Sequence, residues 1–279
     1  MRVEITELHT YPVKSCRGSS HAASLLHATG FEWDRHWMFV TESGRFITQR
    51  ECAALARVEP AVEGRTLVLR SAGHPELRCP VETSGAPRPV RIWNDDCLAH
   101  PVSVDTRDWL QAVAGIRAQL VRLGPGAERV SNPRFTGNEE SRYYLADAFA
   151  LLITNESSLA DLNTRLPKTV PMARFRPNIV VRGLAPYAED DIERLVIGPV
   201  ELRCVKPCIR CITITTDQAS GERDGAEPLR TLGTYRRLPA LNGVAFGMNA
   251  VIARGAGVTL AVGDRAEVVW RAPGAPRAW

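Results

Sequence analysis

Several features that would assign a function class are missing from this sequence of 279 residues. It contains no window close to the roughly 18 unbroken apolar residues of a membrane-spanning helix. It opens with an alternating, strand-like pattern over residues 2–8 instead of an apolar leader. These absences predict a cytoplasmic protein without a membrane segment. The net charge is only +4, and basic residues form no run interleaved with aromatic residues, so nucleic acid is not an expected partner.

Lysine is scarce. Of the 35 basic residues only Lys14, Lys168 and Lys206 are lysines, and all others are arginines. A lysine ammonium is compact, whereas an arginine guanidinium is a planar fork, so the few lysines can mark positions where the shape of the cation matters. With three cases, chance gives the same picture.

The sequence also gives no sign of cysteines paired in disulfides. The seven cysteines are an odd number in a chain without an export signal, so a disulfide framework is not expected. Three of them, Cys204, Cys208 and Cys211, cluster near an alternating run that ends at Asp217. This cluster is the first candidate for a functional site.

The spacing of the cluster leaves several interpretations open. Structural zinc needs four ligands, and the sequence has no histidine after His100. The C-x3-C-x2-C spacing matches an iron-sulfur motif of radical enzymes, but that motif stands early in its barrel and this one stands late. A redox pair of Cys208 and Cys211 would open a helix, whereas β-branched residues follow Cys211. Buried, unreactive thiols are the remaining alternative.

The first half of the chain is predicted to be mostly β. Short apolar runs alternate with turn residues, and a helix beginning after Asp105 or Thr106 and running through Val113 follows them. We place a domain boundary near residue 120, which gives domains 1–120 and 121–279, and we interpret residues 124–126 and 131–133 as loops. The expected strands are residues 3–8, 37–41, 46–49, 66–70 and 90–93.

The second half is predicted to begin with one helix and to continue as strands. The helix covers residues 157–166, is capped by Asn155 or Ser157 and is ended by Pro167. The strands that follow suggest a closed or nearly closed barrel. The expected fold class is therefore α+β, mostly β. The expected strands are residues 178–182, 195–197, 200–205, 211–215, 249–253 and 258–269.

Eight motifs, in the same order over nearly the whole chain, resemble the MOSC proteins, and in particular the branch with an N-terminal MOSC β-barrel domain. This branch includes the mitochondrial amidoxime-reducing component and its bacterial relatives. The resemblance implies a MOSC β-barrel domain packed against an N-terminal β-barrel-like domain. The motifs are Tyr11-Pro-Val-Lys-Ser-Cys-Arg-Gly18, Asp34-Arg-His-Trp37, Asn155-Glu-Ser-Ser-Leu-Ala-Asp-Leu-Asn163, Arg174-Phe-Arg-Pro-Asn-Ile-Val180, Tyr187-Ala-Glu-Asp190, Cys208-Ile-Arg-Cys-Ile-Thr-Ile-Thr-Thr-Asp217, Pro228-Leu-Arg-Thr-Leu232 and Phe246-Gly247.

The resemblance implies a molybdenum cofactor, a pyranopterin that carries a dithiolene and a phosphate. The metal ligand and catalytic residue would be Cys211, whose soft thiolate suits a metal in a sulfur environment. The family is also associated with pyridoxal phosphate binding. The cofactor-binding positions implied by the resemblance are Lys14, Ser15, Arg35 and Arg176 for the phosphate, Asp147 and Asn178 for the pterin, and Arg210 and Asn249 beside them.

The reaction implied by the resemblance is the two-electron reduction of N-hydroxylated compounds, such as amidoximes, hydroxylamines and N-hydroxylated bases, to amines and water. We expect a monomer whose electrons come from a separate ferredoxin-, flavodoxin- or cytochrome b5-like protein, because no ferredoxin-like cysteines follow Cys211. The alternative is a carrier that delivers the cofactor or sulfur without turnover. No general acid is identifiable from the residues.

Overall fold

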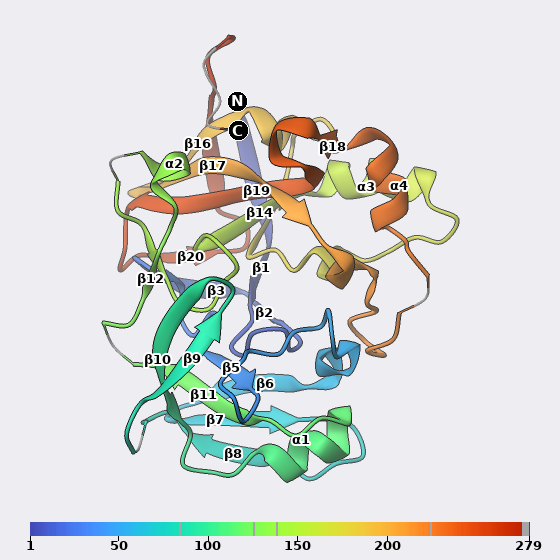
Figure 1. The fold of residues 1–279 in the computed structure, drawn as a ribbon. Helices are drawn as coiled ribbons and strands as arrows, with labels where there is room; N and C mark the ends of the chain where they lie inside the picture. The colour runs from blue at the N-terminus through green and yellow to red at the C-terminus, as the bar shows by residue number, and fades with distance from the viewer. Residues whose placement is uncertain (84, 125, 138, 224, 275–278) are drawn as a thin grey trace.

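The computed structural model describes residues 1–279 except 84, 125, 138, 224 and 275–278. Two β units lie one above the other (Figure 1). The upper unit in this view is a closed barrel, formed mainly by the second half of the chain. The lower unit contains the first half, in blue to green, and is a curled sheet that forms half of a barrel. The fold is mostly β, as the sequence predicts.

Seven strands close the upper barrel. The sheet closes because β14 pairs with β15 on one side, in parallel, and with β19 on the other. Every other neighbouring pair in the ring is antiparallel. In ring order the strands are β14 (Leu151–Asn155), β15 (Ile179–Arg182), β1 (Arg2–Thr10), β21 (Arg265–Trp270), β16 (Ile192–Ile197), β17 (Val200–Arg210) and β19 (Gly243–Arg254).

The first strand of the chain belongs to this barrel. Strand β1 lies between β15 and β21, so the barrel contains residues from both sides of the predicted boundary near residue 120. Alternate side chains of β1, among them Val3 and Ile5, point into the barrel core, where they are buried with Leu202 and Cys204 of β17. The chain therefore leaves the barrel after β1, builds the lower unit and then returns.

The lower unit holds its own apolar core. Trp37 and Phe39 of β5 are fully buried there with Leu110 of α1. Helix α1 begins after Thr106, one of the two predicted caps. The elements of this unit are β5 (Trp37–Val40), η1 (Ala53–Arg57), β6 (Glu59–Glu63), β7 (Thr66–Arg70), β8 (Leu77–Pro80), β9 (Arg88–Ile92), β10 (Asp95–Pro101), α1 (Arg107–Ala114) and β11 (Gln119–Leu123).

Short elements cover the barrel and connect the two units. Helix α3 follows the prediction closely, because the Asn155 side chain accepts a hydrogen bond from Ser157 N, and the helix ends at Arg165. The remaining elements are β2 (Ser19–His21), β3 (Ala23–His27), β4 (Gly30–Phe31), β12 (Arg129–Val130), α2 (Pro133–Thr136), β13 (Arg142–Tyr143), α3 (Glu156–Arg165), η2 (Met172–Phe175), η3 (Ala188–Asp191), η4 (Ile212–Thr215), α4 (Leu229–Tyr235), β18 (Arg237–Leu238), η5 (Pro239–Leu241) and β20 (Thr259–Ala261).

Four local predictions were wrong. The strand predicted over residues 258–269 is two strands, β20 and β21, separated by a turn in which Asp264 N donates to Ala261 O. Residues 211–215 form the 3-10 turn η4 instead of a strand: Ile214 N donates to Cys211 O, and Ile214 packs into an apolar cluster, so tertiary packing overrides the β-branched pattern. Residues 46–49 form no strand, and only Phe46 makes a bridge there. Residues 131–133 are not all loop, since Pro133 opens the short helix α2.

Candidate functional site

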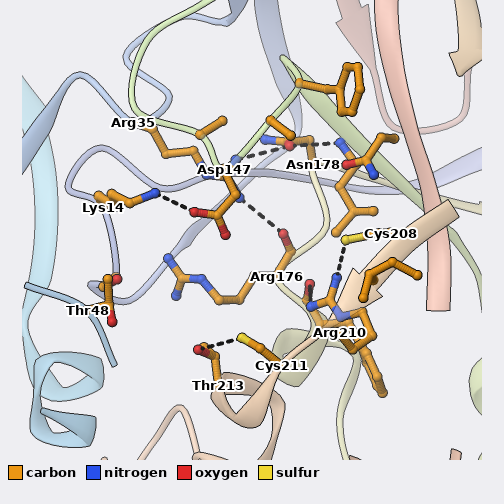
Figure 2. Close-up of a pocket in the computed structure, with 18 of the residues that line it drawn as sticks. Lys14, Arg35, Thr48, Asp147, Arg176, Asn178, Cys208, Arg210, Cys211 and Thr213 are labelled. Carbon is orange, nitrogen blue, oxygen red and sulfur yellow. Dashed lines mark hydrogen bonds and ion pairs between the residues drawn. The ribbon is translucent and has the colours of Figure 1, made fainter. Parts of the chain in front are cut away.

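One cavity of about 190 Å³ lies where the two units meet (Figure 2). Lys14 and Thr48 reach it from the first half of the chain, and Arg210 and Cys211 reach it from the end of β17 and the turn that follows. All nine residues that the sequence analysis proposes as site residues line this cavity: Lys14, Ser15, Arg35, Asp147, Arg176, Asn178, Arg210, Cys211 and Asn249.

Cys211 is the N-cap residue of η4, and its thiol faces the cavity. Its sulfur lies 3.3 Å from the Thr213 hydroxyl. Burial raises the pKa of the Cys211 thiol, but the Thr213 hydroxyl and amide and the charge of Arg50 lower it by more, and the pKa lies below its ordinary value. The turn that replaces the predicted strand therefore supplies the groups that favour a thiolate.

The other two cysteines of the cluster have different surroundings. Cys204 is buried in the barrel core, away from the cavity. Cys208 lines the cavity, and its sulfur accepts a hydrogen bond of 2.9 Å from Arg210 Nη1. Among the described residues, no three or more His, Cys, Asp or Glu side chains are grouped as a metal site. A metal or cluster held jointly by the three cysteines is therefore not supported.

Lys14 and Asp147 form an ion pair at one wall of the cavity. Lys14 Nζ donates to Asp147 Oδ1 at 2.6 Å and to Leu145 O at 2.7 Å. Burial lowers the pKa of Lys14, although Asp147 acts in the opposite direction. The protein atoms around the cavity partly desolvate Asp147 and oppose its ionisation, but Lys14 holds the pKa of that carboxyl well below its usual range. The carboxylate remains open to the cavity, with 68% of the Asp147 side chain exposed.

Arg35 and Arg176 are fixed by a shared aromatic ring and by hydrogen bonds. Their guanidinium carbons lie 4.4 and 4.3 Å from the centre of the Tyr11 ring. Arg35 Nη1 donates to Asp34 Oδ2 at 2.6 Å and to Asn178 Oδ1 at 3.1 Å. Arg176 Nη1 donates to the backbone oxygen of Cys16 at 2.6 Å. Both cations are thus held in place at the cavity wall without a ligand.

The backbone at this wall is strained. Ser15, Arg35 and Arg176 have φ angles of 67°, 54° and 55°, in the left-handed region that residues other than glycine seldom occupy. A fourth residue that lines the cavity, Trp93, also has a left-handed backbone, with a φ angle of 56°. Such strain persists where the surrounding structure over-determines it, and it concentrates at functional sites.

The three remaining predicted residues already form hydrogen bonds within the protein. Asn178 Oδ1 also accepts from Leu152 N at 3.1 Å, and Asn178 Nδ2 donates to a backbone oxygen of β1. Arg210 Nη2 donates to Phe175 O at 2.8 Å, and Asn249 Nδ2 donates to Lys206 O at 3.3 Å. Asn178 therefore orients Arg35, whatever further contact it makes with a ligand.

The sequence analysis missed part of the site. Arg50 and Trp93 lie in none of the recognised motifs, yet both line the cavity, with the guanidinium 4.3 Å from the ring centre. Thr213 lies inside a recognised motif, but the alternating pattern assigned it to a strand. Lys206 also lines the cavity, which its rarity as a lysine could have indicated.

Electrostatically the cavity suits an anion. The only acidic side chain among the described lining residues is Asp147, and it is paired with Lys14. Cations at this density favour a ligand with several negative charges, such as a phosphate. Six cationic side chains line the cavity: Lys14, Arg35, Arg50, Arg176, Lys206 and Arg210.

The fold and site define a two-unit β protein with a cationic cavity at the junction and a cysteine there whose thiol pKa is lowered. Two family models match the chain: the MOSC N-terminal beta barrel domain over residues 2–117 and the MOSC domain over residues 140–267. The chain therefore belongs to the MOSC family, in the branch that carries both domains.

Relatives with the same organisation match most of the chain. It is 33% identical to the mitochondrial amidoxime-reducing component 1 of Mus musculus, with 83% of this chain and 71% of the relative covered. It is 35% identical to component 2 of Bos taurus, with 83% of this chain and 72% of the relative covered. It is 34% identical to component 1 of Homo sapiens, with 84% of this chain and 72% of the relative covered. In the described part of the chain, every helix is too short or too polar to cross a membrane.

Proposed function

We propose that this protein is a molybdenum-cofactor-dependent reductase of N-hydroxylated compounds. The observation that carries the proposal is the convergence of the nine predicted site residues, seven of them in the recognised motifs and many far apart in sequence, on one cationic cavity that contains the Cys211 thiol. The names of its relatives in mouse, cattle and human describe amidoxime reduction by those proteins. Their similarity to this chain supports the same class of reaction.

The donor groups of the cavity fit the proposed cofactor. Its phosphate would be held by Lys14, Ser15, Arg35 and Arg176, which are buried or bonded in position before any ligand arrives. The exposed carboxylate of Asp147 is available to the donor-rich edge of the pterin. The lowered pKa of the Cys211 thiol favours the deprotonated sulfur that a metal requires.

When bound, the cofactor supplies a metal centre that can take up an oxygen atom and exchange two electrons. The protein then positions it, excludes water and holds the substrate. The two electrons for each turnover would come from a separate electron-donor protein. The substrate would be a small N-hydroxylated molecule that enters beside Cys211.

The test is production in a host that makes molybdenum cofactor, with molybdenum and pterin measured per chain. Reduction of an amidoxime would be followed with a chemical electron donor, so that no partner protein is needed. We expect near-equal molybdenum and protein, and amidoxime reduction that is lost in Cys211→Ser. Cys97→Ser, which changes a half-buried thiol in β10, is the matched control and should keep both metal and activity.

A carrier without turnover would use the same cavity. It would contain cofactor at the same ratio, yet it would reduce no N-hydroxylated compound with any electron donor. That result would replace the reductase proposal with the carrier. A protein without molybdenum or pterin would contradict both.

A further inference from the structure

Lys206 is a cavity lysine that forms no ion pair with a carboxylate among the residues that the structure describes. It lies in β17 and lines the cavity together with Cys208, two residues further along the same strand. Its Nζ atom lies 4.7 Å from the centre of the Phe135 ring. The ionisable groups that act on it in the described structure are Cys208 of its own strand and Arg134 of α2. The other cavity lysine, Lys14, is neutralised by Asp147.

A β-bulge directs Lys206 toward the cavity. The register between β17 and β19 shifts between Cys204 and Lys206, so Cys204 and Val205 are both buried in succession. After the shift Lys206 pairs with Asn249, whose side chain donates to Lys206 O. Bulges change the face to which a side chain points and occur next to active sites. The strand therefore places Lys206 in the cavity wall, with its ammonium group beside Phe135.

The proposed reaction consumes protons. Reduction of a hydroxylamine follows R–NH–OH + 2e⁻ + 2H⁺ → R–NH₂ + H₂O, in which the N–O bond breaks, the oxygen leaves as water and the electrons come from the donor protein. The guanidinium groups of the cavity cannot supply these protons, because arginine does not deprotonate in proteins. The Lys14 ammonium is held in an ion pair, and Asp147 carries no proton.

We propose that Lys206 is a proton donor of this site, passing one proton to the substrate oxygen as the N–O bond breaks and recovering it from solvent, while the second proton reaches the amine nitrogen from solvent. This role rests on the proposed reductase function. It accounts for a lysine at this position in a chain that uses arginine at 32 of its 35 basic positions. An arginine would keep the charge but could not transfer the proton.

The environment of Lys206 favours proton transfer. Burial lowers the pKa of its ammonium, Cys208 opposes this shift and Arg134 adds to it, with a net lowering. A general acid works best when its pKa is near the working pH, so a lowered pKa improves an amine for this task. Since the acid must be protonated, activity should fall as the pH rises through the pKa of Lys206.

The first test measures the protonation of the Lys206 side chain directly and does not depend on enzyme activity. The chain has three lysines, so the cofactor-loaded protein labelled with ¹³C at lysine Cε should give three resolvable signals in an NMR pH titration. Lys206→Arg assigns one of them by its disappearance. We expect the Lys206 midpoint to lie below that of Lys168, which is exposed. A Lys206 midpoint equal to or above that of Lys168 would overturn the proposal.

The second test separates charge from proton transfer. Lys206→Arg and Lys206→Met should keep molybdenum and pterin at the wild-type ratio but lower kcat by about 10²-fold, a typical contribution of general acid catalysis. The alkaline fall of the kcat profile should be absent in both. Small primary amines in the buffer should restore part of the activity of Lys206→Met. Lys168→Arg is the control and should behave as wild type.

The outcomes distinguish this role from the function on which it rests. If the wild type is active, and Lys206→Arg is equally active with the same pH profile, the role of Lys206 is overturned while the reductase function stands. A wild type that is loaded with cofactor but reduces no N-hydroxylated compound would overturn the reductase function, and this role with it.

Discussion

The Nζ atom of Lys14 lies 2.6 Å from Oδ1 of Asp147, and this ion pair joins the segment after β1 to the segment before β14. The two residues are far apart in sequence and come from opposite sides of the predicted domain boundary. The same ammonium also donates to Leu145 O. One lysine therefore fixes the cavity wall and presents a carboxylate to whatever the cavity holds.

Removing the two members of this pair should have unequal effects. Lys14→Met should lower the free energy of unfolding by about 1–3 kcal/mol, because it leaves the Leu145 carbonyl without its buried donor. Asp147→Asn should cost less, since Asp147 is largely exposed and solvent screens its charge. Chemical denaturation of both variants measures the difference. Equal losses would show that the hydrogen bond from Lys14 to Leu145 O adds nothing to stability beyond the ion pair.

The backbone strain at Arg176 can be separated from its charge. Arg176→Gly and Arg176→Ala both remove the guanidinium, and both should reduce the phosphate-dependent retention of cofactor. Glycine adopts the φ of 55° without strain, so the glycine variant should be more stable than the alanine variant by about 1 kcal/mol. Thermal unfolding of the cofactor-free proteins provides the comparison, and an alanine variant as stable as the glycine variant would refute the strain.

The sequence was sufficient to predict the fold class and nine of the residues that meet in the cavity. The barrel follows from alternating strands, and α3 follows from a capping asparagine and a terminating proline, which are local signals. The family resemblance identified these nine residues, seven of them in the recognised motifs, because it carries three-dimensional information that spacing alone does not. Their roles toward a cofactor remain predictions.

The remaining features depend on tertiary contacts. The turn after Cys211 forms because Ile214 is buried in an apolar cluster, which the alternating pattern of residues 211–215 does not reveal. Arg50 reaches the cavity by lying over Trp93, and no pattern in the sequence joins these two residues. The position of β1 within the barrel likewise requires long-range pairing with β15 and β21.

Glu189 predicts a pH dependence of stability. It is fully buried and hydrogen-bonded to Ser158 and Asn155, and burial raises the pKa of its carboxyl from 4.5 to about 7. The folded protein therefore binds a proton that the unfolded chain releases between these values. Stability from this group is full below about pH 4.5 and is lost as the pH rises toward 7.

Glu189→Gln removes this dependence. Relative to wild type, the variant should gain stability between pH 4.5 and 7, by roughly 3 kcal/mol if the whole shift is expressed. Urea unfolding at several pH values in this range measures the difference between the two proteins. A difference that stays constant with pH would mean that Glu189 titrates alike in the folded and unfolded chains.

Closure of the barrel depends on Gly247. This residue of β19 has a φ of 78°, and a Cβ atom there would lie 2.8 Å from both Ile153 O and Thr154 Cγ2 of β14. Because Ile153 O is a backbone atom, β14 and β19 would have to separate to make room for the added Cβ. This position lies next to the residue pairs that join β14 to β19 and close the barrel. Gly247→Ala should therefore lower the free energy of unfolding by about 3 kcal/mol or more.

Gly64→Ala provides the matched control. Gly64 has a φ of 59° but no atom within 4 Å of the added Cβ, so this variant carries the cost of the left-handed backbone alone, about 1–2 kcal/mol. Denaturant unfolding of the two variants isolates the steric part of the effect. If Gly247→Ala lost no more stability than Gly64→Ala, the close approach of β14 and β19 would not limit the residue at position 247, and the barrel seam would tolerate a side chain there.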